Sequence, residues 1–565
     1  MKRFVKIVSL LMVLVSGVSQ VACGKSENNV TTTTTAASTA AITTVKQEEE
    51  KPPVEYTFDP SVPKAAIQAT TLYQIGEPSS FSDKLAISTL QGLVANLSEE
   101  QIMISGGAYN NYRTYLKRNW GCTYQSKVDG NAITLEVLMA HYKDLLSGYI
   151  LASADSSSDS GNVAISLAGI LNAVVVTPEN QKICDDLGMI CLLDATDKDD
   201  AWLRASEYWA SLNQTIAFEQ PLSMAPKLVD YAVMSKSYFS FYNGHNSTEH
   251  RNKYKFLSNG GIVFGYNNTL GEYDTVASFS AENIQMIPSD HAYNLSTLSG
   301  FKTAVLEQKT TEISNETSKK VHTVCIIMSD GDNVQWMTND FTTSDKWWAN
   351  KNRGKFNMGW GLPATAIDLT APFTEYLYDS MSEKDEFIMQ LGGLGYTFPS
   401  KWSVEAREEM AAKLSEYMIR SDLHYAEILD DNGMTRTVMN SFTKQDGIDG
   451  LFYIDYSNYA GMNGKILWSN GKPVVAARYR LWANTSDGSV DGIAKAINRA
   501  STEPTSADSY SFIIVHAWSG LSGNNLVEGG NTMNAVAELV RLLDNDVEVV
   551  TPSEFMNRII ANEAK

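Results

Sequence analysis

The chain has 565 residues, of which 43% are hydrophobic and 19% charged, and its formal net charge is −20 at pH 7. This composition fits a globular protein of about three domains and excludes a wholly disordered chain, a collagen and a coiled coil. The acidic balance excludes a general coat for DNA or RNA and favours a neutral or cationic small molecule or glycan as ligand. Five cysteines without a CxxC pair give no disulfide scaffold or zinc pattern, and we predict no metal and no cofactor.

Residues 1–22 have the pattern of a secretory signal peptide. A basic start is followed by an apolar stretch at 7–18, which is shorter than the about 20 residues of a bilayer span. Ala22, Cys23 and Gly24 then resemble the cleavage box of a bacterial lipoprotein, with ordinary signal cleavage nearby as the alternative. We predict a lipid on Cys23, which would anchor the protein outside the cytoplasm on the bacterial cell membrane.

The segment from 23 to 61 is rich in Thr, Glu and Pro without periodicity, which predicts a disordered linker. From 62 to 215, helical patterns alternate with short β-branched runs such as AVVVT, which predicts an N-terminal α/β domain. Residues 216–320 are less regular and predict a second, smaller α/β domain. No GxGxxG or P-loop pattern indicates a nucleotide site.

The stretch from 321 to 565 contains eight short β-rich runs separated by helical patterns or loops. The runs are HTVCIIM, FNMGWGL, EFIMQLG, YAEILD, GLFYIDY, PVVAARY, SFIIVHA and DVEVVTP. This number and spacing predict a (β/α)7-8 barrel-like catalytic domain, with a doubly wound open sheet as the alternative.

Ionisable and hydrogen-bonding side chains follow nearly every one of these runs, where the catalytic residues of a parallel barrel lie. Because buried charges are costly unless paired, a purely structural barrel gives no reason for this pattern. We predict four catalytic carboxyl residues: Asp330, Asp332, Asp455 and, in reserve, Glu427. We predict eight substrate-binding residues: Gly393, Gly395, Tyr396, Arg478, His516, Trp336, Trp360 and Trp518.

Each of these residues also has a structural interpretation. Asp330 and Asp332 fit a turn or a helix cap, and Asp455 fits an ion pair with Arg478. Glu427 fits a position that faces solvent. Eight of the 11 tryptophans follow residue 320, where they could stack on sugar rings or fill space between the barrel and its helices.

The string GLGYTFP at 393–399 resembles the motif that names the GxGYxYP putative glycoside hydrolase family, with Phe398 where that name has Tyr. The strings SDGDN, GYNNTLGEYD and PSDHAYNLS are also similar to this family, so the resemblance covers the chain from about residue 62 to its end. It implies a hydrolase that acts on carbohydrates. It gives no settled catalytic pair, so the residues above rest on their positions after strands.

Three functions are therefore open. The first is a surface-anchored glycosidase with a pair of carboxyl groups and a glycan substrate. The second is a metal-dependent polysaccharide deacetylase, because residues 513–555 resemble the end of such barrels. The third is a lipoprotein that binds carbohydrate without turnover. The sequence predicts no nucleic-acid partner and gives no oligomeric state.

Overall fold

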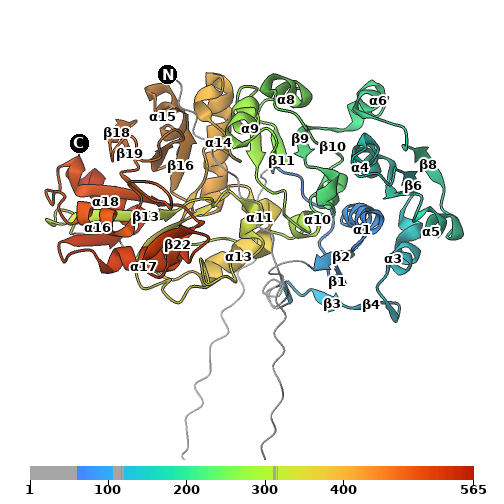
Figure 1. Cartoon of the computed structure of the whole chain (residues 1–565), viewed down its shortest axis with the longest axis horizontal. Coiled ribbons are helices and arrows are strands. Elements are labelled where there is room, and N and C mark those ends of the chain that lie inside the picture. The colour runs from blue at the N-terminus through green and yellow to red at the C-terminus, as the bar shows by residue number, and fades with distance from the viewer. Residues whose placement is uncertain are drawn as a thin grey trace, which may run out of the picture. The chain divides into compact units, whose positions relative to one another are not determined.

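The computed structural model describes residues 60–105, 113, 116–117, 120–309, 313–314, 316–431 and 433–564 (Figure 1). All of these residues belong to one compact unit. The predicted signal peptide at 1–22, Cys23 and nearly all of the linker at 23–61 lie outside the described residues. Within the described ranges, no helix is long and apolar enough to cross a membrane.

Two small sheets with parallel pairing form the first part of the described chain, in the orders β2-β1-β3 and β7-β6-β8. Helix α4 begins after Ser158, whose side chain accepts from the Ser160 amide, and is capped at its end by Asn172 in the left-handed region. The strands are β1 Thr71–Gly76, β2 Glu100–Ser105, β3 Thr123–Gln125, β6 Gly148–Leu151, β7 Ala173–Val176 and β8 Cys191–Asp194, with a hairpin of β4 Lys127–Val128 and β5 Asn131–Ala132. The helices are α1 Phe81–Val94, α3 Leu135–Tyr142, α4 Asp159–Leu171, α5 Gln181–Asp186 and α6 Asp200–Ala205.

A third parallel sheet follows, in the order β10-β9-β11-β12. Its central strands are buried, because helices pack against it and a parallel sheet needs cover on both faces. The strands are β9 Asn213–Glu219, β10 Ser237–Ser240, β11 Ile262–Gly265 and β12 Gln285–Ile287. The helices are α7 Val229–Met234, α8 Ser247–Tyr254, α9 Glu272–Ser280 and α10 Leu295–Ser299.

The C-terminal part is built on a curled sheet of ten strands in the described chain, in the order β18-β19-β17-β16-β15-β14-β13-β21-β20, with β24 beside β13. Each of the eight predicted β-rich runs overlaps one of its strands. These are β13 His322–Met328, β14 Met358–Leu362, β15 Asp385–Met389, β16 Tyr425–Asp430, β17 Gly450–Asp455, β19 Lys472–Ala476, β21 Tyr510–Val515 and β24 Val547–Val550. The sequence did not predict β18 Ile466–Ser469, β20 Tyr479–Leu481 or the hairpin of β22 Ser519–Ser522 and β23 Asn525–Glu528.

The helices of this part connect the strands. They are α11 Val334–Met337, α12 Ala366–Leu369, α13 Ala371–Ser380, α14 Val404–Arg420, α15 Arg436–Thr443, α16 Val490–Ile497, α17 Thr532–Arg541 and α18 Pro552–Asn562. Except for β18, the strands of the curled sheet pair in parallel, so the protein is mixed α/β with a curled half-barrel of strands.

Two strands near opposite ends of this path, β19 and β20, are consecutive in the chain. Only Ala477 and Arg478 separate them. The Ala477 amide donates to the Tyr453 carbonyl on β17, and the Arg478 amide donates to the Phe512 carbonyl on β21. This two-residue link therefore forms hydrogen bonds with both β17 and β21.

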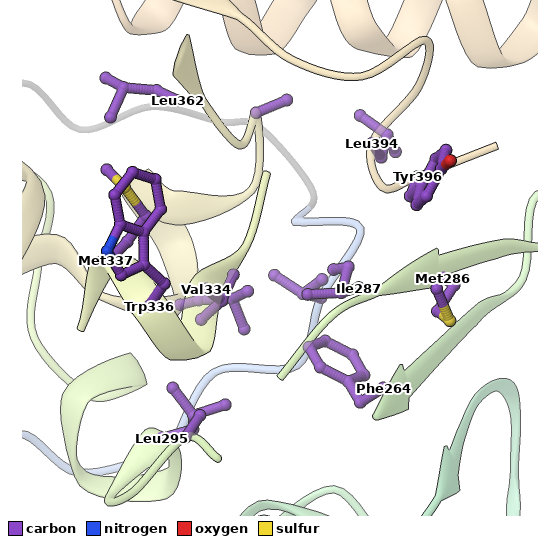
Figure 2. Close-up of a cluster of buried hydrophobic side chains, with 14 of the residues drawn as sticks. Phe264, Met286, Ile287, Leu295, Val334, Trp336, Met337, Leu362, Leu394 and Tyr396 are labelled. Atoms are coloured by element: carbon purple, nitrogen blue, oxygen red, sulfur yellow. The ribbon is translucent and has the colours of Figure 1, made fainter. Parts of the chain in front are cut away.

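One hydrophobic cluster joins the third sheet to the C-terminal part (Figure 2). Phe264 and Met286 come from β11 and β12, whereas Trp336 and Leu362 come from α11 and β14. The backbones of Met286 and Tyr396 also pair as an antiparallel bridge. Side chains and backbone thus hold the end of the third sheet against the curled sheet.

Candidate active site

A cavity of about 470 Å³ lies where the third sheet meets the carboxyl ends of the curled sheet. Five carboxyl groups and two histidines line it, and we call it the acidic cavity: Glu272, Asp290, Asp330, Asp332, Glu427, His291 and His516. No lysine or arginine is among the described residues that line it. No group of three or more His, Cys, Asp or Glu in the described part of the chain is arranged to hold a metal ion.

Asp330 and Asp332 reach the acidic cavity through a turn after β13. β13 ends at Met328 and Asp330 has a φ of 65°, so the strand does not continue through Gly331. Gly331 fixes this turn against β14, because its amide donates to Gln390 at 2.7 Å and a Cβ there would lie 2.2 Å from the Gly361 carbonyl oxygen. A side chain at position 331 would therefore displace both acids.

Asp332 is 4% exposed. Burial raises its pKa well above the ordinary value, and the charges of Asp330 and Glu272 raise it further. Asp330 is partly exposed, and its carboxyl group accepts from the Ser329 hydroxyl. The turn thus holds one buried acid with a raised pKa beside a second acid that is partly exposed.

Glu427 projects from β16 into the acidic cavity and is fully buried. Neither of its carboxyl oxygens has a hydrogen-bond partner in the described structure. Gln390 lies nearby, but its amide donates to the Met328 carbonyl. Burial raises the pKa of Glu427 well above its ordinary value; Asp332 and Asp330 add to the rise, and the Gln390 side chain opposes it. A buried, unpartnered carboxyl group in a cavity is unusual in a native fold and is typical of a functional group.

Aromatic rings form one wall of the acidic cavity. Trp482 and His516 stack at 3.9 Å with an interplanar angle of 5°, and Tyr459 meets Trp482 edge-on at 4.5 Å. Burial lowers the pKa of His516, which favours its neutral form, although the charge of Asp330 opposes this. Trp518 also lines the cavity. Such a wall offers flat apolar faces beside hydrogen-bonding groups.

Asp455 is not among the residues that line the acidic cavity. It pairs in register with Asp430 on β16, whereas Leu429 and Ile454, one residue earlier on each strand, line the cavity. Because side chains alternate along a strand, Asp455 points to the other face. There its carboxylate accepts from the amide and hydroxyl of Ser457. The structure therefore does not bring Asp455 together with the other predicted acids.

Three other predicted contact residues have structural partners instead of cavity positions. Arg478 donates to the carbonyls of Tyr510 and Ala507 at 3.0 and 2.9 Å, so it secures the chain between β20 and β21. Trp360 is buried and donates to Asp385 at 2.9 Å. Trp336 is buried, and its ring packs on Trp518 and other rings behind the cavity.

The GLGYTFP loop joins the third sheet to the curled sheet. The Leu394 and Gly395 amides donate to the Gln285 side chain, and Met286 and Tyr396 exchange two backbone hydrogen bonds. A Cβ at Gly395 would lie 2.6 Å from the Met286 carbonyl oxygen, and one at Gly393 would lie 2.4 Å from Gln285. Gly395 is thus required for the backbone contact with β12, Gly393 lies against the Gln285 side chain, and neither glycine lines the acidic cavity. Only Tyr396 of the loop's predicted residues does so.

Three domains of one family match the chain in order. The GxGYxYP_N second domain matches residues 146–212, the GxGYxYP third domain matches 213–300, and the GxGYxYP putative glycoside hydrolase C-terminal domain matches 320–559. The chain belongs to the GxGYxYP family.

The chain is also similar to a solved protein, a putative hydrolase from Bacteroides thetaiotaomicron VPI-5482. The two are 27% identical with a TM-score of 0.79, over 89% of this chain and 98% of that one. No curated protein matched the sequence. The description of the family's C-terminal domain and that of the solved protein both name a putative hydrolase.

Sequence reasoning missed the residues that the third GxGYxYP domain supplies to the acidic cavity. Glu272 begins α9, and the Tyr396 hydroxyl donates to its Oε1 at 2.8 Å. Asp290 follows β12, and its buried Oδ1 has no partner in the described structure. Both follow strands of a parallel sheet, so the rule used for the curled sheet would have found them.

Proposed function

We propose that this protein is a glycoside hydrolase that works by carboxyl acid–base catalysis in the acidic cavity. One observation carries the proposal: Asp332 and Glu427 are two buried carboxyl groups with raised pKa values in the same cavity as the partly exposed Asp330. Hydrolysis of a glycosidic bond needs a protonated and an ionised carboxyl group on either side of that bond.

In this reaction Asp332 or Glu427 donates a proton to the glycosidic oxygen as the bond from that oxygen to the anomeric carbon breaks. Burial raises the pKa of both groups and so favours the protonated form that a general acid requires. Asp330 is the carboxylate that faces the developing positive charge at the anomeric carbon. Water then bonds to that carbon, and its proton passes to a carboxylate.

The lining also fits a carbohydrate that carries no negative charge. Trp482 and Tyr459 give aromatic faces for a sugar ring, and the carboxyl groups accept from its hydroxyls. Since Asp330 is ionised in this scheme and no lysine or arginine lies in the described lining to offset its charge, an anionic sugar would be repelled. The acidic net charge of the chain acts in the same direction.

We further propose that the link at Ala477 and Arg478 closes the curled sheet into a barrel-like ring between β17 and β21. Its two amide hydrogen bonds to opposite neighbours support this. The ring would direct the ends of β13, β16 and β21 to one cavity. An experimental structure in which the link makes no hydrogen bond to β17 or none to β21 would exclude the closed ring.

We also propose that the protein is anchored to the outer face of the cell membrane by a lipid on Cys23. The order of a basic start, an apolar stretch and Ala22-Cys23-Gly24 supports this. A Cys23→Ala protein should be released or left unprocessed, as seen by membrane fractionation. An unchanged membrane fraction would contradict the anchor.

A screen of neutral oligosaccharides and aryl glycosides would test the activity, followed by Asp332→Asn, Glu427→Gln and Asp330→Asn. Each variant keeps the size of the side chain and removes its acid–base function, so kcat should fall by at least about 10²-fold. Asp455→Asn is the matched control outside the cavity and should keep near-normal kcat. Full activity in all three cavity variants would refute the proposal.

A further inference from the structure

The third domain supplies a carboxyl group that the chemistry above does not use. Glu272 lines the acidic cavity and lies close enough to Asp330 and Asp332 for their charges to affect one another. It is separated in sequence from Asp330 by more than 50 residues. The Tyr396 hydroxyl of the GLGYTFP loop donates to it at 2.8 Å.

We propose that Glu272 contacts the substrate directly, accepting a hydrogen bond from a sugar hydroxyl, and that Tyr396 is the residue that positions it. This inference rests on the proposed glycoside hydrolase activity. It gives the tyrosine of the family motif a role in the site, while the glycines of that motif serve the contact between domains.

The start of α9 is held in place by a buried asparagine. The Asn267 side chain donates to Glu219 at 2.6 Å and to the Tyr242 carbonyl at 2.8 Å, and it accepts from the Leu270 amide at 2.8 Å. Asn267 is fully buried. These bonds fix the turn that precedes Glu272, so its backbone is set before any ligand arrives.

The far end of α9 is tied to the same glutamate. His250 lies 2.6 Å from Glu219 through Nε2 and 2.6 Å from Ser278 through Nδ1. This chain of contacts from serine through histidine to glutamate is arranged like a hydrolytic triad. However, all three side chains are buried and none lines the acidic cavity. We therefore assign it a supporting role: one buried network fixes both ends of the helix that presents Glu272.

The surroundings of Glu272 set its ionisation. Burial raises its pKa and the charge of Asp330 raises it further, whereas the hydrogen bond from Tyr396 lowers it. Among the described residues, Asp332 and the hydroxyls of three tyrosines also interact with its charge: Tyr266, Tyr456 and Tyr459. Tyr396 thus favours the ionised form, which is the stronger acceptor for a sugar hydroxyl.

Two measurements on the full chain test this. First, ¹³C NMR of protein labelled at the glutamate carboxyl carbon, with Glu272→Gln for assignment, gives the pKa of Glu272 without any substrate. Tyr396→Phe should raise that pKa by about one unit, because a hydrogen bond to the ionised form is lost. Tyr73→Phe is the matched control. Tyr73 also donates to a glutamate, Glu100, at a distance of 3.0 Å, and neither residue lines the acidic cavity. This variant should leave the Glu272 signal unchanged.

Second, kcat/KM is measured against pH on a glycoside found in the screen. Glu272→Gln should lower kcat/KM by about 10²-fold. Tyr396→Phe should shift the acidic limb of the profile to higher pH by the same amount as the Glu272 pKa measured by NMR. Activity should recover above that pH. A loss of packing alone would lower activity at every pH and leave the limb in place.

The outcomes separate this inference from the proposed function. An unchanged Glu272 pKa in Tyr396→Phe overturns the positioning role, whatever the protein hydrolyses. Normal kcat/KM in Glu272→Gln overturns substrate contact, while Asp332→Asn still reports on the hydrolase activity. A raised Glu272 pKa supports the positioning role even if no glycoside is hydrolysed.

Discussion

Replacing Glu427 by Gln should stabilise the protein at neutral and alkaline pH. Glu427 is fully buried and neither carboxyl oxygen has a hydrogen-bond partner in the described structure. Because its pKa is raised in the folded state, that state keeps a proton that the unfolded chain releases. Its contribution to stability is complete below the unfolded pKa of about 4.3 and is lost as the pH rises through the folded pKa.

The gain follows from the cost of an unpartnered buried group. Such a group costs about 1–3 kcal/mol, and more when it is charged. A neutral amide of the same size removes the charged form but leaves a polar group, so Glu427→Gln should raise the free energy of unfolding by about 1–3 kcal/mol at pH 8. At pH 4 the wild-type carboxyl is already neutral, and the difference should fall below about 0.5 kcal/mol.

Glu386 provides the matched control on the neighbouring strand β15. It is also buried and burial also raises its pKa, but the amide and hydroxyl of Ser553 donate to its two oxygens at 2.9 and 2.6 Å. Glu386→Gln replaces one acceptor by a donor and should lower stability by about 1–3 kcal/mol. Urea unfolding of both variants at pH 4 and pH 8 measures whether each substitution raises or lowers the free energy of unfolding. A Glu427→Gln protein that is less stable than wild type at pH 8 would refute this reasoning.

Three further predictions follow from the site. Gly395→Ala should cost about 1–3 kcal/mol in urea unfolding because of its contact with Met286, whereas Gly76→Ala, which has no neighbour within 4 Å, should cost less; equal costs would contradict the contact. Trp482→Ala should raise KM for a glycoside about tenfold by removing a stacking face; an unchanged KM would exclude it as a ligand contact. Uronic acid glycosides should be hydrolysed at least about tenfold more slowly than their neutral counterparts, and equal kcat/KM would refute the charge argument.

The strands of the C-terminal part could be predicted because parallel strands buried on both faces are continuous apolar runs. HTVCIIM, which forms β13, is buried along its whole length. The short antiparallel pair of β22 and β23 could not, since the run SGLS has few β-branched or aromatic residues and its pairing depends on the turn at 523–524.

The position of a residue after a strand pointed to several side chains that line the acidic cavity, although their catalytic roles are proposals. Asp330 and Asp332, which follow β13, are examples. The same rule failed for Asp455 because a strand end presents alternate residues to opposite faces, and the register that places Ile454 inward turns Asp455 away. Sequence alone gives the end of a strand but not which of its last two residues faces the cavity.

The glycines of the GLGYTFP loop show where local sequence reasoning stops. A glycine indicates that a backbone is approached closely, and we expected a ligand to make that approach. The contacts at Gly393 and Gly395 are instead with Gln285 and Met286, from a strand that precedes them by more than 100 residues. What approaches a glycine is set by long-range packing, which one sequence does not contain. The same packing brings Glu272 to Tyr396, so the motif and the missing acid become intelligible only together.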